Sequence, residues 1–290
     1  MQTLQLLLNG LAQGCVYALV ALGLVLIYKA TETVNFAQGE LMMVGGFVAL
    51  IALQLLGLPF WVALLLALLG AALLGFGVER FLLRPLLGQP AFTLVLMTLA
   101  ASMVLRGVVM MIPGGTDTHV LQAPWREAVL HLGGLQLNAD RLVVMLATTA
   151  LAGVLFLGFR YTRIGIAMQA ASQNQIAAHY VGIPVERLNA LVWALSGATA
   201  ALAGVLLAPM TFVHVGMGFV GLKALPAAVL GGFASLPGAF VGGLLIGVTE
   251  ALAGFYLPEG FKDVAPYAMV LLVLMFMPDG LFGGHIRKKV

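Results

Sequence analysis

Charged residues and cysteine are scarce in this 290-residue chain, and each scarcity excludes a class of protein. Only 9% of the residues are charged, whereas a soluble domain carries about 25%, so the chain has too little polar surface for a water-soluble fold. Its one cysteine, Cys15, excludes an intrachain disulfide, a thiol redox pair and a cysteine-rich zinc site. Its 14 basic residues are too few and too scattered for a nucleic-acid surface.

Long apolar runs fill most of the sequence and predict an all-α, polytopic membrane protein with eight or nine transmembrane helices. Hydrophobic residues make up 62% of the chain, and the mean hydropathy is +1.08. A crossing helix needs about 20 apolar residues. The candidate spans are 4–28, 36–57, 60–79, 91–112, 141–159, 188–208, 236–256 and 264–282, with a shorter, Gly- and Pro-interrupted piece at 221–234 that we expect to be broken or re-entrant. No basic segment precedes the first run, so we expect it to remain as a span rather than act as a cleaved signal.

The distribution of Lys and Arg predicts the orientation. If the polar segment 160–187 is cytoplasmic, nine basic residues fall on that side and three on the other. The nine are Lys29, Arg80, Arg84, Arg160, Arg163, Arg187, Arg287, Lys288 and Lys289, and the three are Arg126, Arg141 and Lys262. The C-terminus is then inside and the N-terminus outside, which requires an odd number of crossings. We therefore expect 221–234 to cross, whereas an eight-span alternative would have it turn back.

Two polar segments interrupt what we otherwise interpret as one transmembrane domain, 1–290. The loop at about 113–140 lies outside in this orientation, and we expect an amphipathic helix at 124–132 with Trp125 at the membrane interface. The segment at 160–187 is alanine-rich with basic ends, which predicts a short cytoplasmic helix between two spans. A helix of small residues in that place offers a docking surface to a cytoplasmic partner.

Small residues recur at four-residue intervals in two of the runs. The first run carries Gly10, Gly14 and Ala18, and the seventh carries Ala239, Gly243, Gly247 and Ala251. Such faces let helix backbones approach closely in lipid, so we expect packing within the chain, with a subunit interface or a substrate path as the alternative. The similarity between 39–49 and 237–247 is also consistent with two inverted repeats.

Ionisable residues at membrane depth are rare and indicate functional sites by default. Glu40, Arg106, Lys223 and Glu250 lie within or beside apolar runs. One interpretation is the polar lining of a transport pathway, and the other is that Arg106 and Glu250 extend their side chains to the outer interface. Lys223 is suited either to a substrate carboxylate or to a structural carbonyl or glutamate.

The sequence contains no motif that supports catalysis. Residues 216–221 spell Gly-x-Gly-x-x-Gly, but no βαβ unit surrounds them, so chance in a chain with 36 glycines explains the match. No P-loop motif is present, and the five histidines lack metal-ligand spacing. We therefore expect a chain that is not an enzyme and that holds no metal or cofactor of its own.

Four blocks of sequence, in order along the chain, carry a family resemblance. Residues 34–40 read Val-Asn-Phe-Ala-Gln-Gly-Glu, and residues 177–182 match most of a Glu-Ala-Ala-x-x-x-Gly pattern, with Ile176 in the Glu position. Segments 221–243 and 278–283 are rich in glycine, although Met277 stands where arginine is common in such endings. Together these blocks resemble the branched-chain amino acid permease family of ATP-binding-cassette importers, LivH type, over nearly the whole chain.

This resemblance implies a permease subunit in a bacterial inner membrane, for branched-chain amino acids or, as in related permeases, for urea, amides or another small polar organic. It also implies a second homologous permease, two cytoplasmic subunits that bind ATP, and a periplasmic or extracellular substrate-binding protein. The residues expected to couple to the ATPases are Arg163, Ala170, Gln173, Asn174, Ala177, Ala178 and Gly182, and the substrate-pathway candidates are Asn35, Gln38, Glu40, Thr98 and Lys223. A bulky residue at Gly182 is expected to leave the protein folded and to uncouple transport from ATP hydrolysis.

Two other classes of function remain as alternatives. A stand-alone secondary transporter needs a proton or ion site, usually of paired carboxylates at mid-depth. We take Glu40 and Glu250 to be the only acids within spans, and nothing in the sequence places them together. An intramembrane enzyme is the third hypothesis, which the absence of a catalytic motif weakens.

Overall fold

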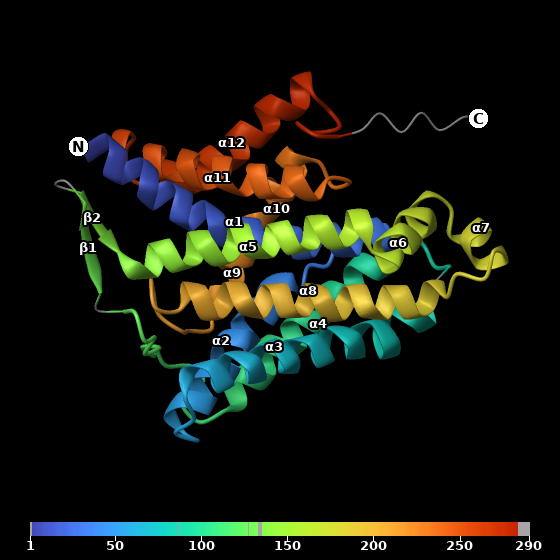
Figure 1. Cartoon of the computed structure of the whole chain (residues 1–290), viewed down its shortest axis with the longest axis horizontal. Helices are drawn as coiled ribbons and strands as arrows, with labels where there is room; N and C mark the ends of the chain where they lie inside the picture. The colour runs from blue at the N-terminus through green and yellow to red at the C-terminus, as the bar shows by residue number, and fades with distance from the viewer. Residues whose placement is uncertain (1, 87, 127, 133–134, 284–290) are drawn as a thin grey trace.

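The structure of the protein is a computed structural model that describes residues 2–86, 88–126, 128–132 and 135–283. It is a bundle of helices, several of which lie along its long axis (Figure 1). The elements are α1 (Gln2–Thr31), α2 (Gln38–Gln54), α3 (Phe60–Gly77), the π-helical η1 (Val78–Leu83), the 3₁₀ turn η2 (Arg84–Leu86), α4 (Ala91–Met111), β1 (Val129–Leu132), β2 (Leu135–Asn138), α5 (Ala139–Tyr161), α6 (Arg163–Gln173), α7 (Gln175–Tyr180), α8 (Val185–Leu207), α9 (Met217–Leu222), α10 (Ala224–Gly231), α11 (Leu236–Tyr256) and α12 (Phe261–Phe276). Among the described residues, α1, α3, α4, α5, α8 and α11 are long and apolar enough to cross a membrane, which confirms the predicted class.

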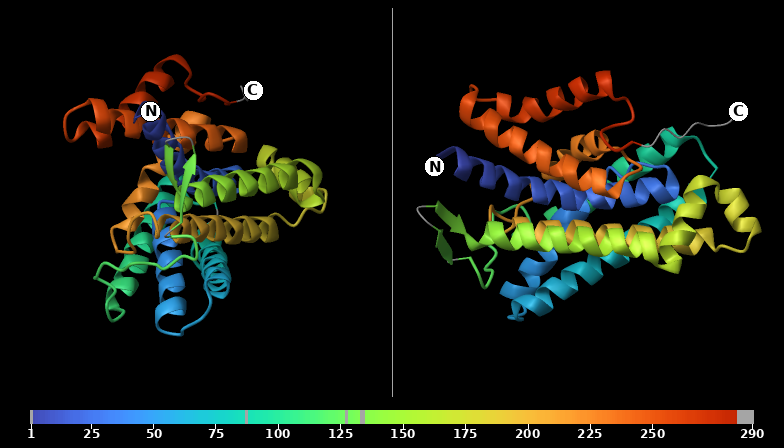
Figure 2. Two further views of the ribbon diagram at one scale, coloured as in Figure 1. Left: turned by 60° about the vertical axis from the view of Figure 1, so that its left-hand side comes forward. Right: turned by 45° about the horizontal axis from the view of Figure 1, so that its top comes forward.

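The first helix is the centre of the bundle. From residue 15 to residue 27, the hydrophobic side chains of α1 are almost fully buried, and α1 packs against α11, α8, α5 and α10. In the views of Figure 2 it lies between α11 and α12 on one side and α3 on the other. The chain thus surrounds its own first span with later ones.

Small residues bring α1 and the antiparallel α11 into backbone contact. A Cβ atom at Gly247 would lie 2.2 Å from the backbone nitrogen of Gly14, and one at Gly243 would lie 2.5 Å from the Cα of Ala18. A Cβ at Gly10 would meet the Cβ of Ala251 at 2.9 Å. The two predicted small-residue faces therefore pack on each other within the chain, as expected where close van der Waals contact holds helices together.

The second span begins as extended chain rather than as helix. Residues 32–37 are non-helical, and α2 starts at Gln38, whose Nε2 donates to the backbone oxygen of Ser196 at 3.1 Å. The Ser196 hydroxyl in turn donates to the backbone oxygen of Gly23 at 2.9 Å. Both partners lie in the middle of their helices, so α2 begins inside the bundle. It continues to the opposite end, where Gln54 Nε2 donates to the backbone oxygen of Val120.

The Gly- and Pro-interrupted piece crosses the bundle as two short helices, α9 and α10, that meet at Lys223. Gly221 touches Gly39 at the start of α2, and Gly231 touches Gly238 at the start of α11. That this piece spans the membrane, as the orientation requires, stays a prediction. α12 ends at Phe276 rather than near residue 282, because the chain then turns and hydrogen-bonds the end of α10 through Leu281 and Phe282.

The loop between α4 and α5 differs from the expectation. Residues 124–132 do not form an amphipathic helix, because β1 pairs antiparallel with β2 from Val129 opposite Asn138 to Leu132 opposite Leu135. Apolar and polar residues alternate in β2, and this period of two favours a strand. Trp125 packs edge-on against Phe60 at 4.8 Å between ring centroids.

Two further expectations concern the internal repeat and the basic residues at the C-terminus. α2 and α11 run in the same direction through the bundle, so the similarity between 39–49 and 237–247 does not relate inverted segments. Arg287, Lys288 and Lys289, which contribute to the predicted orientation, lie outside the described residues.

The glycine contact between α1 and α11 makes a stability prediction. Gly247→Ala should lower the free energy of unfolding by about 1–3 kcal/mol, because the added methyl group overlaps backbone atoms of α1. Gly153→Ala is the matched control, since a Cβ there meets nothing within 4 Å and alanine favours the helix. Denaturation in detergent micelles measures both. Equal effects of the two substitutions would contradict close packing at Gly247.

Candidate functional site

The polar segment between α5 and α8 folds into two short helices rather than one. Thr162 caps α6 by accepting from Gly165 N at 3.0 Å, and Asn174 caps α7 by accepting from Ala177 N at 2.9 Å. Asn174 has an extended backbone, which separates the two helices. The segment protrudes from one end of the bundle (Figure 1). Gln175 fastens it to α1 by donating to the backbone oxygen of Ala30 at 3.0 Å.

The predicted coupling residues divide into an exposed set and one buried member. Most of them are exposed, namely Arg163, Ala170, Gln173, Asn174, Ala177 and Gly182. Ala178 is buried and packs with Ala171, Ile183 and Val185, so it holds α7 against the start of α8. The structure therefore presents one face of α6 and α7 to the surroundings and uses Ala178 to hold that face in place.

Gly182 has a backbone role in this segment. Its φ of +85° lies in the left-handed region, which costs other residues about 1–2 kcal/mol. A Cβ atom there would meet nothing within 4 Å, so conformation and not crowding selects glycine. Gly182 N donates to the backbone oxygen of His179 and Ile183 N to that of Ala178, which ends α7 and turns the chain toward α8.

Two exposed residues at the tip of the segment were not predicted. Tyr180 is 85% exposed and Val181 is 76% exposed, although the segment around them is polar. Apolar side chains that remain exposed beside a polar surface favour contact with another protein. Their position at the end of α7, before the glycine turn, is a signal that sequence reasoning can use.

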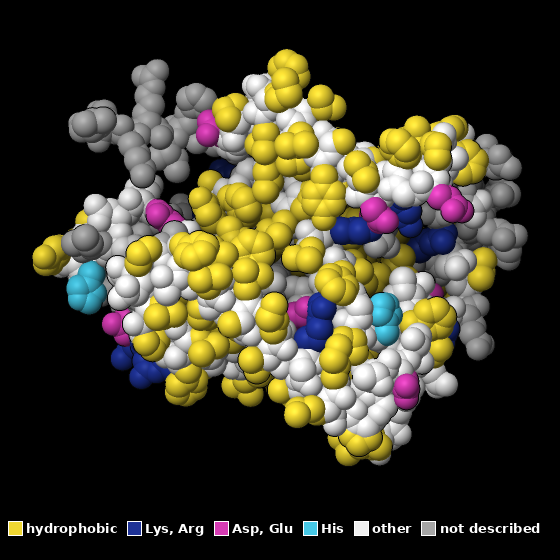
Figure 3. Space-filling view, turned by 180° about the vertical axis from the view of Figure 1, so that it is seen from behind, with side chains coloured by type: hydrophobic (Ala, Val, Ile, Leu, Met, Phe, Trp, Pro, Cys, Tyr) yellow, Lys and Arg dark blue, Asp and Glu magenta, His cyan; other side chains and the backbone are white. Residues whose placement is uncertain are grey.

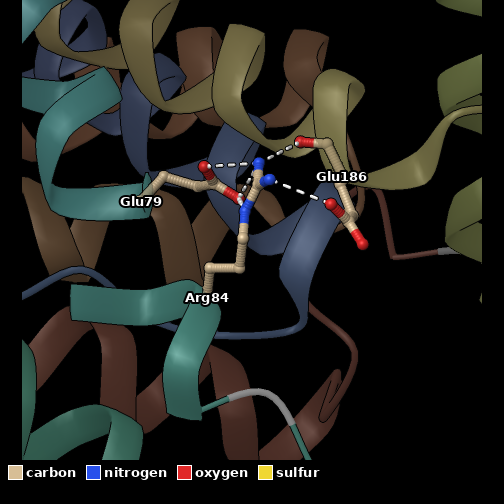
Figure 4. A network of polar contacts seen from close by, with 3 residues as sticks. All are labelled: Glu79, Arg84 and Glu186. Atoms are coloured by element: carbon tan, nitrogen blue, oxygen red, sulfur yellow. Dashed lines mark hydrogen bonds and ion pairs between the residues drawn. The ribbon is translucent and has the colours of Figure 1, made fainter. Parts of the chain in front are cut away.

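An arginine connects the end of α3 to the start of α8 (Figure 4). Arg84 donates through Nη2 to Glu79 Oε2 at 3.1 Å and through Nη1 to Glu186 Oε2 at 2.9 Å. Nη2 also donates to the backbone oxygen of Glu186 at 3.2 Å. Glu79 is fully buried and lies within the span Phe60–Leu86, so the expectation that Glu40 and Glu250 are the only acids within spans is wrong. This network holds Glu186 in the first turn of α8, directly after the segment of α6 and α7.

A second group of polar side chains lies inside the bundle, where α2 begins. Asn35 Nδ2 donates to Gln38 Oε1 at 3.1 Å, and Thr98 Oγ1 accepts from the backbone nitrogen of Phe36 at 3.3 Å. The Ser196 hydroxyl lies 3.0 Å from Gln38 Oε1. Three of the pathway candidates, Asn35, Gln38 and Thr98, thus lie together and hold the extended chain in place.

The other two candidates belong to separate ion pairs on either side of α9. Glu40 pairs with Arg106, whose guanidinium lies 4.2 Å from the centroid of the Phe219 ring. Lys223 Nζ lies 2.8 Å from Glu250 Oε1 and 2.7 Å from Asp263 Oδ1. The hydroxyl of Tyr17 also donates to Glu250. Arg106 and Glu250 therefore do not extend alone to the interface, because each pairs with an opposite charge within the chain.

These ion pairs are not sealed inside the protein. The side chains of Arg106 and Lys223 are 25% and 24% exposed, and Phe219 is 56% exposed between them on α9. The face behind that of Figure 1 is hollowed, lined largely by hydrophobic side chains, and carries basic and acidic groups side by side (Figure 3). Charge on a membrane-depth surface is costly against lipid, which favours a protein or water boundary on this face.

No group of three or more His, Cys, Asp or Glu residues among those the structure describes could hold a metal ion. The expectation that the chain needs no cofactor stays a prediction.

Comparisons with known proteins show the family to which this chain belongs. The family model described as branched-chain amino acid transport system / permease component matches residues 6–277. The chain is 32% identical to the high-affinity branched-chain amino acid transport system permease protein LivH of Salmonella typhimurium, over 99% of this chain and 97% of that one. It is 32% identical to the corresponding permease BraD of Pseudomonas aeruginosa, over 99% and 98%. A fructose import permease of Bifidobacterium longum, FruF, is 29% identical over 93% of this chain and 76% of its own length.

The Glu40–Arg106 pair predicts a non-additive pair of substitutions. Arg106→Met leaves a buried carboxylate unpaired and should cost about 3 kcal/mol of unfolding free energy. Glu40→Gln combined with Arg106→Met should recover more than half of that loss, since no unpaired charge remains. Denaturation of the single and double variants in detergent gives the coupling energy. Additive losses would show that the two residues do not interact.

Proposed function

The chain belongs to the family of branched-chain amino acid transport permease components, and from that membership we propose that it is the membrane-spanning subunit of an ATP-driven importer of branched-chain amino acids. The observation that carries the proposal is the match along nearly the full length of permeases with that named role. The subunit has no catalytic task in this scheme. It provides the path, and other subunits provide the energy.

Such an importer needs parts that this chain does not supply. We propose a second, homologous permease beside it, two ATPase subunits in the cytoplasm, and a substrate-binding protein outside. The membrane is then a bacterial plasma membrane, with α6 and α7 in the cytoplasm and the β1–β2 hairpin outside. The N-terminus lies outside and the C-terminus inside in this arrangement.

The exposed face of α6 and α7 is the proposed docking site for an ATPase. Ala177 leaves room for close contact, and Tyr180 and Val181 offer apolar surface at the tip. An ATPase that grips this segment better in one state than in the other shifts the permease toward that state. Because α8 starts directly after the segment and is tied to α3 through Arg84, movement of the segment reaches both helices.

The hollowed face around α9 is the proposed wall of the substrate path, shared with the second permease. Covering this face with protein or water explains how Arg106 and Lys223 remain partly exposed at membrane depth. Glu40 Oε2 supports the assignment, since it is buried without a hydrogen-bond partner among the described residues. A buried acceptor of that kind suits water or a passing ammonium group.

Specific observations bear on the two alternatives, another substrate and a transporter that works without ATP. The fructose permease among the relatives makes another small polar organic the alternative substrate. A stand-alone secondary transporter has less support, because Glu40 and Glu250 each pair with a cation and not with each other.

Reconstitution tests the proposed function. The chain, purified with its ATPase, second permease and binding protein, should take up leucine into proteoliposomes only when ATP is present. The chain alone should take up none. Uptake by the chain alone without ATP would support a secondary transporter, and ATP-driven uptake of fructose or urea but not leucine would support the alternative substrates.

A substitution on the docking face tests the coupling role separately. Ala177→Trp should leave the fold intact, because Ala177 is exposed, and should lower ATP-driven uptake about tenfold for a docking loss of about 1.4 kcal/mol. Gln89→Trp, on another exposed loop at the same end, is the control. Normal uptake by the Ala177 variant, or an equal loss in both, would contradict docking at this face.

A further inference from the structure

A groove lies beside the arginine network, on the side of the bundle where α3 and η1 meet the first turns of α8. It encloses about 670 Å³. Three basic groups, Arg80 and Arg84 from η1 and η2 and Arg187 from α8, surround one end together with the carboxylate of Glu186, which pairs with Arg84. Phe76, Leu191 and Ala194 line the other end. The groove therefore joins a cationic end to an apolar wall.

The charges at the basic end are not balanced. Arg84 is occupied by Glu79 and Glu186. Arg80 and Arg187 are exposed, and neither side chain makes an ion pair or hydrogen bond within the described part of the chain. Two guanidinium groups thus face the groove with their donors free, and guanidinium donors match the oxygens of a phosphate.

The apolar wall continues from this basic end along both helices. Leu191 follows Arg187 by about one turn on α8, so the two share a helix face. Phe76, near the end of α3, lines the same groove as Arg80 of η1. Phe76 is 44% exposed and Leu191 is 38% exposed. Leu73 and Leu195, one turn farther along, are also exposed. This arrangement has the polarity of a phospholipid, with the head at the arginines and a chain along the wall.

We propose that this groove binds one anionic phospholipid of the cytoplasmic leaflet, with its phosphate between Arg80 and Arg187 and an acyl chain against Phe76 and Leu191. Basic pockets between transmembrane helices on the cytoplasmic side bind acidic lipid headgroups. An acidic loop of an ATPase would pair with the arginines but would leave the apolar wall without a partner. The apolar wall therefore favours a lipid as the occupant. The bound lipid joins α3 to α8 beside the Glu79–Arg84–Glu186 network, next to the proposed docking segment.

Lipid retention in nanodiscs tests this site and does not depend on the transported substrate. The full chain is placed in nanodiscs of phosphatidylcholine with a minor share of phosphatidylglycerol, then released, and the bound lipids are measured by native mass spectrometry. The unmodified chain should retain phosphatidylglycerol preferentially. Arg80→Gln with Arg187→Gln should reduce that preference about fivefold per charge, or about 25-fold together. Arg160→Gln with Arg163→Gln, which removes two charges elsewhere on the same side, should leave it unchanged.

A second variant separates a shaped groove from a diffuse attraction. Ala194→Phe fills the apolar end without changing charge, and it should also abolish the retained lipid while the thermal unfolding temperature stays near that of the unmodified chain. Retention of phosphatidylglycerol by both the Arg80/Arg187 variant and the Ala194 variant would overturn the proposal. So would unchanged lipid retention in an Arg80/Arg187 variant that no longer co-purifies with its ATPase, because the arginines would then serve protein docking.

Discussion

The contact between α1 and α11 is the constraint on which the rest of the structure depends. Lipid provides no hydrophobic drive between helices, so backbone approach at Gly14 and Gly247 must supply the attraction. Once α11 lies at this distance, Glu250 meets both Tyr17 of α1 and Lys223 between α9 and α10. The central helix therefore fixes the broken crossing beside it, and with it one boundary of the hollowed face.

Polar groups inside the bundle follow the same constraint, because a bilayer offers no water to satisfy them. In the non-helical chain at 32–37, the side chains of Asn35 and Thr98 accept hydrogen bonds from backbone nitrogens. The buried glutamates Glu40, Glu79 and Glu250 each pair with a basic side chain. Polar groups stay exposed on the face around α9, on the segment between α5 and α8, and in the groove beside Arg84. The proposed path, the proposed docking site and the proposed lipid groove are thus places where the protein leaves polar groups for another molecule to meet.

The long helices were predictable because length and apolarity alone decide a crossing, and the α1 and α11 faces because small residues repeat every four positions. Their mutual contact was not, since no local pattern names a partner. The same holds for Glu40 with Arg106, which lie 66 positions apart in sequence. The helix expected at 124–132 was wrong because Val129–Leu132 pairs with the strand that follows it, a pairing that the segment alone does not reveal. The coupling role of Gly182 stays a prediction, and its positive φ could be learned only from the backbone.

The central claim is that the segment of α6 and α7 lies in the cytoplasm and is gripped there by an ATPase. Cys15 is buried. In a variant with one added cysteine at the exposed position Ala177, a thiol reagent that does not cross membranes therefore reacts only with the added cysteine. The account predicts no labelling in intact cells, labelling in inside-out vesicles, and protection when the ATPase subunits are bound, while a cysteine at Thr118 labels in intact cells. Labelling at Ala177 from outside the cell, or labelling that bound ATPase does not reduce, would contradict it.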